Sequence, residues 1–468
     1  MRYISTRGRA PELEFDDVLL TGLARDGGLY LPQSWPKFSA DEIRALRGLS
    51  YPELAAKVIA PFAVGSIDPA DLSAILTESY RDFGHKAVAP LQQLEPALWV
   101  MELFHGPTLA FKDFAMQFLG RAFDHVLTKR GERVTIVGAT SGDTGPAAIE
   151  ACRDREAVDI FFLYPHGRVS EVQRRQMTTV TSKNVHALAV EGTFDDCQDI
   201  VKAMFNDETF RDDVRLSAAN SINWARIVAQ IVYYFHAAVS LGAPDRAVSF
   251  AVPTGNFGNI YAGYAARAMG LPISQFIIGS NVNDILPRFF DSGALTTGTV
   301  TPTISPSMDI QVSSNFERFL FELYGRDGRA TEAAVTEFRE KGTLSVGSNL
   351  WQKAQDTFDG YRTDEAETKA VIGETYRSSN YLLDPHSAIG VASARARRKD
   401  ATTPVVVLAT AHPAKFPDAV RDASGVYPEL PPALADLRER PERIEVLPND
   451  LQAIQKYVRD HLGIAGPA

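Results

Sequence analysis

The sequence predicts an α/β protein built on parallel sheets, and three observations lead to this prediction. Short apolar runs rich in β-branched residues recur along the chain, at residues 98–104, 133–139, 158–164, 185–190, 247–255, 274–280 and 404–411. Segments of helical length separate these runs. Within each run most side chains are apolar, without a regular alternation with polar ones, which is typical of strands covered on both faces. Such strands in alternation with helices favour parallel sheets between layers of helices.

The length of the chain and the changes of pattern along it indicate several domains. With 468 residues and roughly 150 residues per domain, about three structural units are expected. The first part of the chain reads as helices and turns, with a capped helix starting near Ser39 or Asp41, and Pro90 marks the change to strands. Residues 437–462 read as a polar strand followed by a helix. We therefore expect a mainly helical domain over residues 1–93, a small α/β domain over residues 94–220 and a large α/β domain over residues 221–468.

The charge balance argues against several classes of partner. Lys and Arg total 48 against 58 for Asp and Glu, which gives a net charge of −10. An acidic protein of ordinary globular composition has no general affinity for nucleic acid or for an anionic membrane. A local basic pocket for a small phosphorylated substrate remains compatible with this balance.

The cysteines and the lengths of the apolar runs indicate the cellular compartment in which the protein is expected. Only Cys152 and Cys197 occur, and neither stands in a metal-ligand spacing, so we expect neither a disulfide framework nor a metal site. No apolar run approaches the roughly 20 residues of a membrane helix, and no apolar stretch follows the first positive charges. We therefore expect a cytoplasmic protein without a secretory signal.

A first glycine loop follows the apolar run at 133–139 and leads into a predicted helix with Pro146 in its first turn. A strand, a loop of small residues and a helix start aim free backbone N–H groups at an anion. The residues of this loop would then bind a carboxylate or a phosphate: Ser141, Gly142, Asp143, Thr144 and Gly145. An ordinary βα turn capped by Asp or Thr would give the same pattern.

A second glycine loop follows the run at 247–255, where Gly255 and Gly258 bracket Asn256 and Phe257. The pattern GNFGN differs from the ATP-binding P-loop because no Lys-Ser or Lys-Thr pair follows, and it is shorter than GxGxxG. Both differences argue against ATP hydrolysis and against a nicotinamide cofactor. A compact cradle for a single phosphate group is the better interpretation, with a purely structural turn as the alternative.

A third polar segment leaves the run at 404–411 and contains Thr410, His412 and Lys415. Ligands of open parallel sheets lie outside the carboxyl ends of the strands, so polar groups at this place are candidates for ligand binding. A structural histidine with satisfied hydrogen bonds is the alternative for His412.

Lys112 stands at the edge of an apolar helical face and near the start of the predicted helix. The positive end of a helix and apolar neighbours both lower the pKa of an amine, which favours a neutral nucleophile. A lysine whose stem packs on phenylalanines while its ammonium reaches water would produce the same pattern. The apolar face follows helical spacing and consists of Phe111, Phe114, Ala115, Phe118, Leu119, Ala122 and Val126.

Taken together, a nucleophilic lysine, a phosphate cradle and an anion-binding loop are the parts of a pyridoxal 5′-phosphate site. The chain further carries, in this order, the motifs YISTRG, GLARDGGLYLP, AFKDFAMQF, ATSGDTG, NSINWARI, PTGNFGN, LDPHSAIG and ATAHPAKF. With these motifs the chain resembles the threonine synthase family over nearly its whole length.

The resemblance implies fold type II of the pyridoxal-phosphate enzymes, related to tryptophan synthase β chains, with two α/β domains and an amino-terminal helical unit. By motif, Lys112 would form the Schiff base with the cofactor and Thr410 would share a hydrogen bond with its pyridine nitrogen. The residues Gly255, Asn256, Phe257, Gly258 and Asn259 would bind the cofactor phosphate. Ser141, Gly142, Asp143 and Thr144 would hold the substrate carboxylate. Asn223, Arg226 and Lys415 are candidates for the substrate phosphate, with a structural role as the alternative.

The implied reaction converts O-phospho-L-homoserine and water to L-threonine and phosphate, without a metal and without an obligate protein partner. One alternative is a related lyase or dehydratase that releases 2-oxobutyrate, and the motifs STRG and DGGLYLP favour threonine synthase over it. Another is a non-catalytic binding protein of the same fold. The presence of Lys112 and of both glycine loops argues against that second alternative.

Overall fold

The computed structural model describes residues 1–217 and 221–464 and divides the chain into two compact units. Unit 1 comprises Met1–Val18, Gly22–Ala115 and Ser221–Glu429, and unit 2 comprises Leu19–Thr21, Met116–Asn220 and Leu430–Ala468. The expected domain boundaries at residues 93 and 220 stay a prediction.

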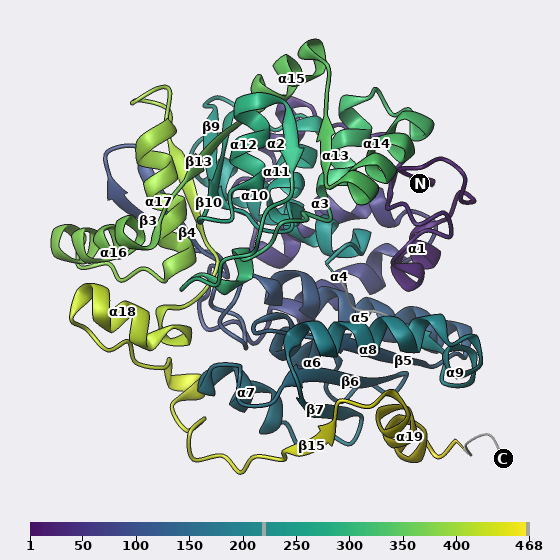
Figure 1. Cartoon of the computed structure of the whole chain (residues 1–468). Coiled ribbons are helices and arrows are strands. Elements are labelled where there is room, and N and C mark those ends of the chain that lie inside the picture. Colours follow the sequence, from purple (N-terminus) through teal and green to yellow (C-terminus); the bar gives the residue numbers. More distant parts are fainter. Residues whose placement is uncertain (218–220, 465–468) are drawn as a thin grey trace. The chain divides into compact units, whose positions relative to one another are not determined.

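Unit 1 is built on a six-stranded sheet in the order β13-β10-β9-β14-β4-β3 (Figure 1). All neighbours in this sheet are parallel except the pair of β3 and β4. The strands are β3 (Leu91–Glu95), β4 (Leu98–Glu102), β9 (Val248–Pro253), β10 (Ile273–Ser280), β13 (Phe358–Arg362) and β14 (Val405–Ala409). Every residue of β9 and β14 is buried, so the prediction of parallel strands covered on both faces is confirmed.

Helices cover the two faces of this sheet, and close contacts identify the face of each. Helix α17 (Pro385–Arg397) lies on the face of Val407, because a Cβ atom at Gly390 would lie 2.7 Å from Val407 Cγ1. Helix α11 (Gly258–Ala268) lies on the opposite face, where a Cβ atom at Gly263 would lie 2.7 Å from the Phe276 ring. Both glycines therefore permit close packing of helix on sheet.

Further helices and two small antiparallel sheets complete unit 1. Strand β1 (Tyr3–Ser5) pairs with β2 (Tyr30–Pro32), and β11 (Ala294–Thr296) pairs with β12 (Thr343–Ser345). The helices include α1 (Phe15–Thr21), whose last residues fall in unit 2, and α2 (Ala40–Arg44), α3 (Tyr51–Ala63), α4 (Pro69–Tyr80), α10 (Trp224–Ser240), α12 (Ile285–Ser292), α13 (Phe316–Leu323), α14 (Gly328–Lys341), α15 (Ser348–Gln355), α16 (Glu365–Ser379) and α18 (Pro417–Ser424).

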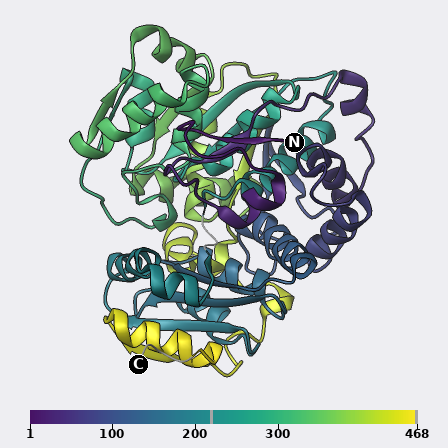
Figure 2. The same ribbon diagram turned by 90° about the vertical axis from the view of Figure 1, so that its right-hand side faces the viewer.

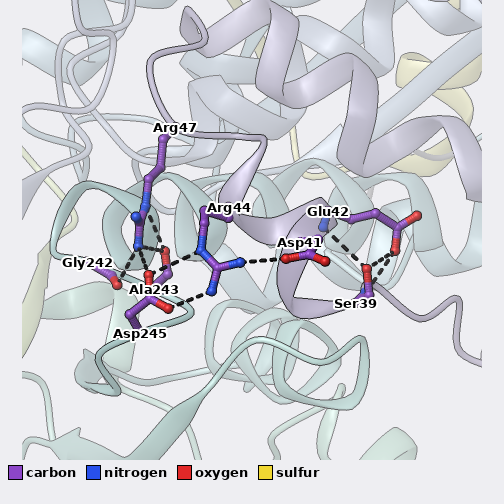
Figure 3. Close-up of polar contacts among 8 residues, drawn as sticks. All are labelled: Ser39, Asp41, Glu42, Arg44, Arg47, Gly242, Ala243 and Asp245. Atoms are coloured by element: carbon purple, nitrogen blue, oxygen red, sulfur yellow. Dashed lines mark hydrogen bonds and ion pairs between the residues drawn. The ribbon is translucent and has the colours of Figure 1, made fainter.

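An arginine cluster joins the short helix α2 to the loop between α10 and β9 (Figure 3). Ser39 caps α2 through a capping box with Glu42, which confirms the predicted helix start. Arg44 contacts Asp245 at 2.6 Å, and Arg47 contacts the same carboxylate at 2.8 Å. The hydrogen bonds from Arg44 and Arg47 lower the pKa of Asp245 to about 2. The amino-terminal helices thus belong to the same packed unit as α10 and β9.

Unit 2 is built on a five-stranded parallel sheet in the order β15-β7-β6-β5-β8. The yellow carboxyl-terminal helix of this unit lies beside its teal elements (Figure 2). The strands are β5 (Val134–Ala139), β6 (Val158–Pro165), β7 (Val185–Glu191), β8 (Leu216–Ser217) and β15 (Glu445–Pro448). Its helices are most of α5 (Lys112–Arg130), α6 (Thr144–Cys152), α7 (Glu171–Thr178), α8 (Phe194–Asn206), α9 (Glu208–Asp213) and α19 (Leu451–Leu462). The polar strand and helix predicted near the carboxyl terminus are thus confirmed as β15 and α19.

Neither a membrane span nor a metal cluster is found among the described residues. In residues 1–217 and 221–464 no helix combines the length and apolar character needed to cross a bilayer. Over the same residues, no group of three or more His, Cys, Asp or Glu side chains is placed to hold a metal ion.

Helix α19 packs on the sheet of unit 2 through a stack of rings around His186. The His186 ring lies parallel to the Phe161 ring at 4.4 Å, and the His461 ring lies 4.8 Å from His186. Burial, followed by the positive charges of His461 and Arg443, lowers the pKa of His186 to about 4 from its ordinary value of 6.5. The neutral ring is therefore the form that unit 2 accommodates.

Acidification is expected to destabilise unit 2 through His186. Because the folded pKa lies below the unfolded one, the stabilisation is complete above pH 6.5 and is lost as the pH falls through about 4. Partial exposure of the ring limits the loss to about 1 kcal/mol. Urea unfolding at pH 7 and at pH 5, with amide exchange in α19 as the readout, measures this loss of stability. His186→Phe keeps the stack and should show a smaller loss, and an equal loss in this variant would contradict the assignment.

Candidate active site

The carboxyl ends of three neighbouring strands define one edge of the sheet in unit 1. Ala409 at the end of β14 pairs with Glu102 of β4, and Val407 pairs with Ala251 of β9. Loops that follow these strands therefore leave the sheet on the same side. The three loops contain Lys112 after β4, the GNFGN motif after β9 and Thr410 after β14.

A short backbone pairing brings Lys112 and Thr410 together. Ala110 forms an antiparallel bridge with Ala411. The Phe111 N–H donates to the Thr410 carbonyl at 2.9 Å, and the His412 N–H donates to the Leu109 carbonyl at 3.0 Å. The residue next to Phe111 is Lys112, so its position beside Thr410 is fixed by main-chain hydrogen bonds.

Lys112 is the first residue of α5, in agreement with its predicted position near the start of the helix. Its Nζ atom lies 5.9 Å from the centroid of the Phe111 ring, and the side chains of Phe114 and Ala115 are fully buried. The amine thus stands at the positive end of a 19-residue helix and beside apolar groups. Both features act to lower the pKa of an amine, and the lowered pKa of Lys112 itself stays a prediction.

The loop that leads to Lys112 is held by Asp113, a residue that the sequence interpretation missed. Its carboxylate accepts hydrogen bonds from the Thr108 N–H at 2.8 Å and from the Thr108 hydroxyl at 2.6 Å. A Cβ atom at Gly106 would lie 2.5 Å from Asp113, so only glycine fits at this position. Burial raises the pKa of Asp113 to about 6, although the bonds from Thr108 and the charge of Lys415 oppose the rise. The position of Asp113 directly after Lys112 in AFKDF is the sequence feature that could have identified it as a residue of the site.

Lys415, in the segment that follows β14, contacts the loop that leads to Lys112. Its side chain is fully buried, and Nζ donates to the Thr108 carbonyl at 2.7 Å. This contact supports a role in holding the loop of Lys112. The predicted role of Lys415 in binding the substrate phosphate stays a prediction.

The GNFGN loop joins β9 to α11 with tight backbone geometry. Phe257 adopts a left-handed conformation with φ 61°, and its ring packs edge-on against Phe316 at 5.1 Å. A Cβ atom at Gly255 would lie 2.7 Å from the Ser307 carbonyl oxygen, so only glycine allows this close approach. Helix α11 begins directly at Gly258, and the N–H groups of its first turn have no partner within the helix.

Asn259 adds a side-chain donor at the start of α11. Its Oδ1 atom accepts hydrogen bonds from the Tyr233 hydroxyl at 2.6 Å and from the Tyr234 hydroxyl at 3.2 Å, which fixes the orientation of the amide. The Nδ2 atom is buried and has no hydrogen-bond partner among the residues that the structure describes. An unpaired buried donor costs free energy unless a ligand completes it. Together with the helix start, this donor set fits a phosphate group.

The start of α10 carries the two other candidates in unit 1. Asn223 caps the helix, since its Oδ1 atom accepts a hydrogen bond from the Ala225 N–H at 2.9 Å. Arg226 is 3% exposed, and its Nε and Nη1 atoms have no hydrogen-bond partner within residues 1–217 and 221–464. Burial lowers the pKa of Arg226 to about 10. A buried guanidinium with unpaired donors fits an anionic ligand.

The ATSGDTG loop lies in unit 2 and joins β5 to α6, which confirms the predicted strand, loop and helix. Thr140 organises it, since its hydroxyl accepts from the N–H groups of Gly142 and Gly145, each at 3.0 Å. Asp143 precedes the helix and accepts a hydrogen bond from Gln173 at 2.9 Å. Ser141 is exposed and Thr144 is the first helical residue. Binding of a carboxylate by this loop stays a prediction.

Family models match almost the entire chain. The model of the threonine synthase N terminus matches residues 2–80, and that of the threonine synthase C-terminal region matches residues 387–458. The model of pyridoxal-phosphate dependent enzymes matches residues 85–411. The last of these spans the loops of Lys112, GNFGN and Thr410.

Curated relatives and solved structures agree with the family models. The threonine synthase of Pseudomonas aeruginosa is 59% identical and covers 98% of each chain. That of Methylobacillus glycogenes is 43% identical over 99% of this chain and 100% of the relative. The structure of pyridoxal-phosphate-bound threonine synthase from Brucella melitensis has a TM-score of 0.97 at 58% identity, covering 98% of this chain and 99% of the other. The yeast threonine synthase structure has a TM-score of 0.94 at 39% identity, covering 99% of both.

These matches confirm the predicted fold type II architecture and the pyridoxal-phosphate cofactor. They also confirm the prediction of a lyase, because the similarity to threonine synthases extends over the full chain. The chain therefore belongs to the threonine synthase family of pyridoxal-phosphate-dependent enzymes.

Proposed function

We propose that this chain converts O-phospho-L-homoserine and water to L-threonine and phosphate, with its cofactor held at Lys112. The pairing of residues 109–111 with residues 410–412 supports this proposal most directly, since it joins the predicted lysine and the predicted partner of the pyridine ring. The similarity to threonine synthases over the full chain supports the choice of substrate.

The cofactor would be held at three points of unit 1. Lys112 would bind it covalently, and Thr410 would share a hydrogen bond with the ring nitrogen. The phosphate would lie at the helix start formed by Gly255, Asn256, Phe257, Gly258 and Asn259, where the Asn259 amide offers an unpaired donor. When bound, the cofactor supplies an electron sink that stabilises a carbanion at the substrate Cα.

The substrate would be held by its two anionic groups. Arg226 would bind the phosphate through its unpaired Nε and Nη1 donors, with Asn223 beside it and Lys415 as a further candidate. Ser141, Gly142, Asp143 and Thr144 would bind the carboxylate through backbone N–H groups and hydroxyls. Because the Arg226 donors are buried, a phosphate would interact with them strongly.

Lys112 would move the protons of the reaction. An amine that is neutral part of the time can accept a proton from the substrate Cα. It can then move protons between Cα, Cβ and Cγ of the substrate. Loss of the substrate phosphate and addition of water at Cβ then give threonine. Asp113 and Lys415 would act indirectly, since their contacts with Thr108 hold the loop that carries Lys112.

The setting of the enzyme is part of the same proposal. We place it in the cytoplasm because Cys152 and Cys197 are both buried free thiols, which suits a reducing compartment. Its partners are a small-molecule substrate and water, with no need for nucleic acid, a membrane or an obligate protein partner.

The products formed from O-phospho-L-homoserine test the substrate and the outcome together. The holoenzyme is expected to release threonine and phosphate in equal amounts, with 2-oxobutyrate as a minor product. Amino-acid analysis and a 2-oxo acid assay on the same sample measure the ratio. A preponderance of 2-oxobutyrate would favour the related lyase, and a protein that binds no cofactor would favour a non-catalytic binding protein.

A further inference from the structure

Two buried polar residues, Asn315 and Arg318, lie next to the GNFGN loop and have no role in the function proposed above. Asn315 directly precedes α13, and Arg318 belongs to its first turn. Both side chains are fully buried, and the Arg318 guanidinium donates to Asn315 Oδ1. Buried polar groups are costly unless their hydrogen bonds are made, so the destinations of the other bonds indicate what the pair does.

One set of bonds reaches the GNFGN loop. The Asn315 N–H and Nδ2 both donate to the Asn256 carbonyl, each at 3.1 Å. The Ser313 hydroxyl donates to the preceding carbonyl, that of Gly255, at 2.7 Å. Two consecutive carbonyl groups of the loop are therefore bound by residues 313–315.

These bonds determine where the loop presents its donors. In a planar trans peptide the N–H of one residue points opposite to the carbonyl of the residue before it. Fixing the carbonyls of Gly255 and Asn256 on residues 313–315 thus directs the N–H groups of Asn256 and Phe257 away from this segment. They stand at the start of α11, where the first-turn N–H groups also lack partners within the helix.

A second set of bonds reaches the chain that enters α10. Asn315 Nδ2 donates to the Ser221 carbonyl at 3.1 Å, and Arg318 Nη2 donates to the Ile222 carbonyl at 2.6 Å. Arg318 also holds the carbonyl of Tyr30 with Nε at 3.0 Å and Nη2 at 2.8 Å. Its Cζ atom lies 5.6 Å from the Trp224 ring. Asn223 lies inside this clamped segment, and Arg226 lies in the first turn that follows.

From these contacts we infer that Asn315 and Arg318 are positioning residues that couple the cofactor-phosphate loop to the segment carrying Asn223 and Arg226. The inference rests on the proposed function, because it assigns ligands to both segments. One side-chain amide donates to both segments, so a shift of either one changes the hydrogen bond to the other. The pair also ties the strand that contains Tyr30 of the motif DGGLYLP to the site.

Asn315→Asp in the full-length enzyme tests the coupling. The carboxylate keeps the shape and the bond with Arg318 but cannot donate to the carbonyls of Asn256 and Ser221. The dissociation constant of pyridoxal phosphate, measured by titrating the apoenzyme, is expected to rise about 10-fold or more. The ³¹P resonance of the bound cofactor should shift. KM for O-phospho-L-homoserine should rise together with the dissociation constant of the cofactor.

Two further variants keep the result interpretable. Ser313→Ala removes only the bond to the Gly255 carbonyl from a half-buried position, so it should fold normally, shift the ³¹P resonance and weaken cofactor binding about 3-fold. Arg326→Met is the matched control, since the side-chain hydrogen bonds of Arg326 among the described residues go to Pro32, Gln33 and Glu322. It should change the melting temperature but neither the ³¹P resonance nor the cofactor affinity.

The inference is overturned if Ser313→Ala and Asn315→Asp bind the cofactor with wild-type affinity and an unchanged ³¹P resonance. It is also overturned if Arg326→Met changes both as strongly as Asn315→Asp, because the effect would then be a general loss of stability. Failure of the proposed function looks different: the wild-type protein would form no threonine, whatever the variants do to cofactor binding.

Discussion

Replacement of Lys112 by alanine is expected to lower the rate of threonine formation by about 10⁴-fold or more. The variant loses the covalent attachment of the cofactor and the amine that moves protons. Stability should change little, because Lys112 is the partly buried first residue of α5. The wild-type protein should be yellow, and borohydride should fix the cofactor to the peptide that contains Lys112.

Lys129→Ala is the control for this prediction, since Lys129 is an exposed lysine in the last turn of the same helix. The control should keep full activity and the borohydride-stable label. Steady-state rates and peptide mapping of both variants decide the matter. Threonine formation at an undiminished rate by Lys112→Ala would remove the basis of the proposed mechanism.

Replacement of Arg226 by methionine is expected to lower kcat/KM for O-phospho-L-homoserine by about 100-fold, mainly through KM. Two charge-assisted hydrogen bonds to a buried phosphate contribute about 1.5–3 kcal/mol each, and part of this is offset by the cost of burying the charge. The same substitution should leave the free energy of unfolding of the ligand-free protein unchanged or raise it by about 1–3 kcal/mol. The reason is that the ligand-free protein buries two guanidinium donors for which the described part of the chain supplies no partner.

The opposite signs in activity and stability separate a ligand-binding arginine from a structural one. Arg318→Met provides the matched comparison, since Arg318 is equally buried but donates to three carbonyl oxygens, those of Tyr30, Ile222 and the Asn315 side chain. Its loss should destabilise the protein by about 3 kcal/mol or more. A similar destabilisation by Arg226→Met, with an unchanged KM, would assign Arg226 a structural role.

The strands and the loops at their ends could be predicted from the sequence because their signals are local. A largely apolar run such as that of β9 identifies a buried parallel strand, and small residues after it identify a turn. The start of α5 near Lys112 could be predicted from the helical spacing of the phenylalanines around it. The sheet order has no such signal. Nothing in the run of β14 indicates that this late strand lies between β4 and β9.

The polar residues that support the site could not be predicted for a related reason. Asn315 and Arg318 are surrounded in sequence by Phe316 and Phe319, and a polar residue beside an apolar face is usually exposed. Only the tertiary structure supplies the carbonyl groups that both side chains bind. Asp113 is similar, because its partner Thr108 becomes recognisable only once the loop is folded.

The main-chain pairing of residues 109–111 with residues 410–412 has a consequence for how the enzyme is made. A ribosome must translate past residue 412 before the lysine and threonine of the site can meet. Contacts between such distant segments form late, because closing a long loop of chain costs entropy. Nascent chains and truncated products that end before residue 410 therefore cannot form this pairing of the vitamin B6 site.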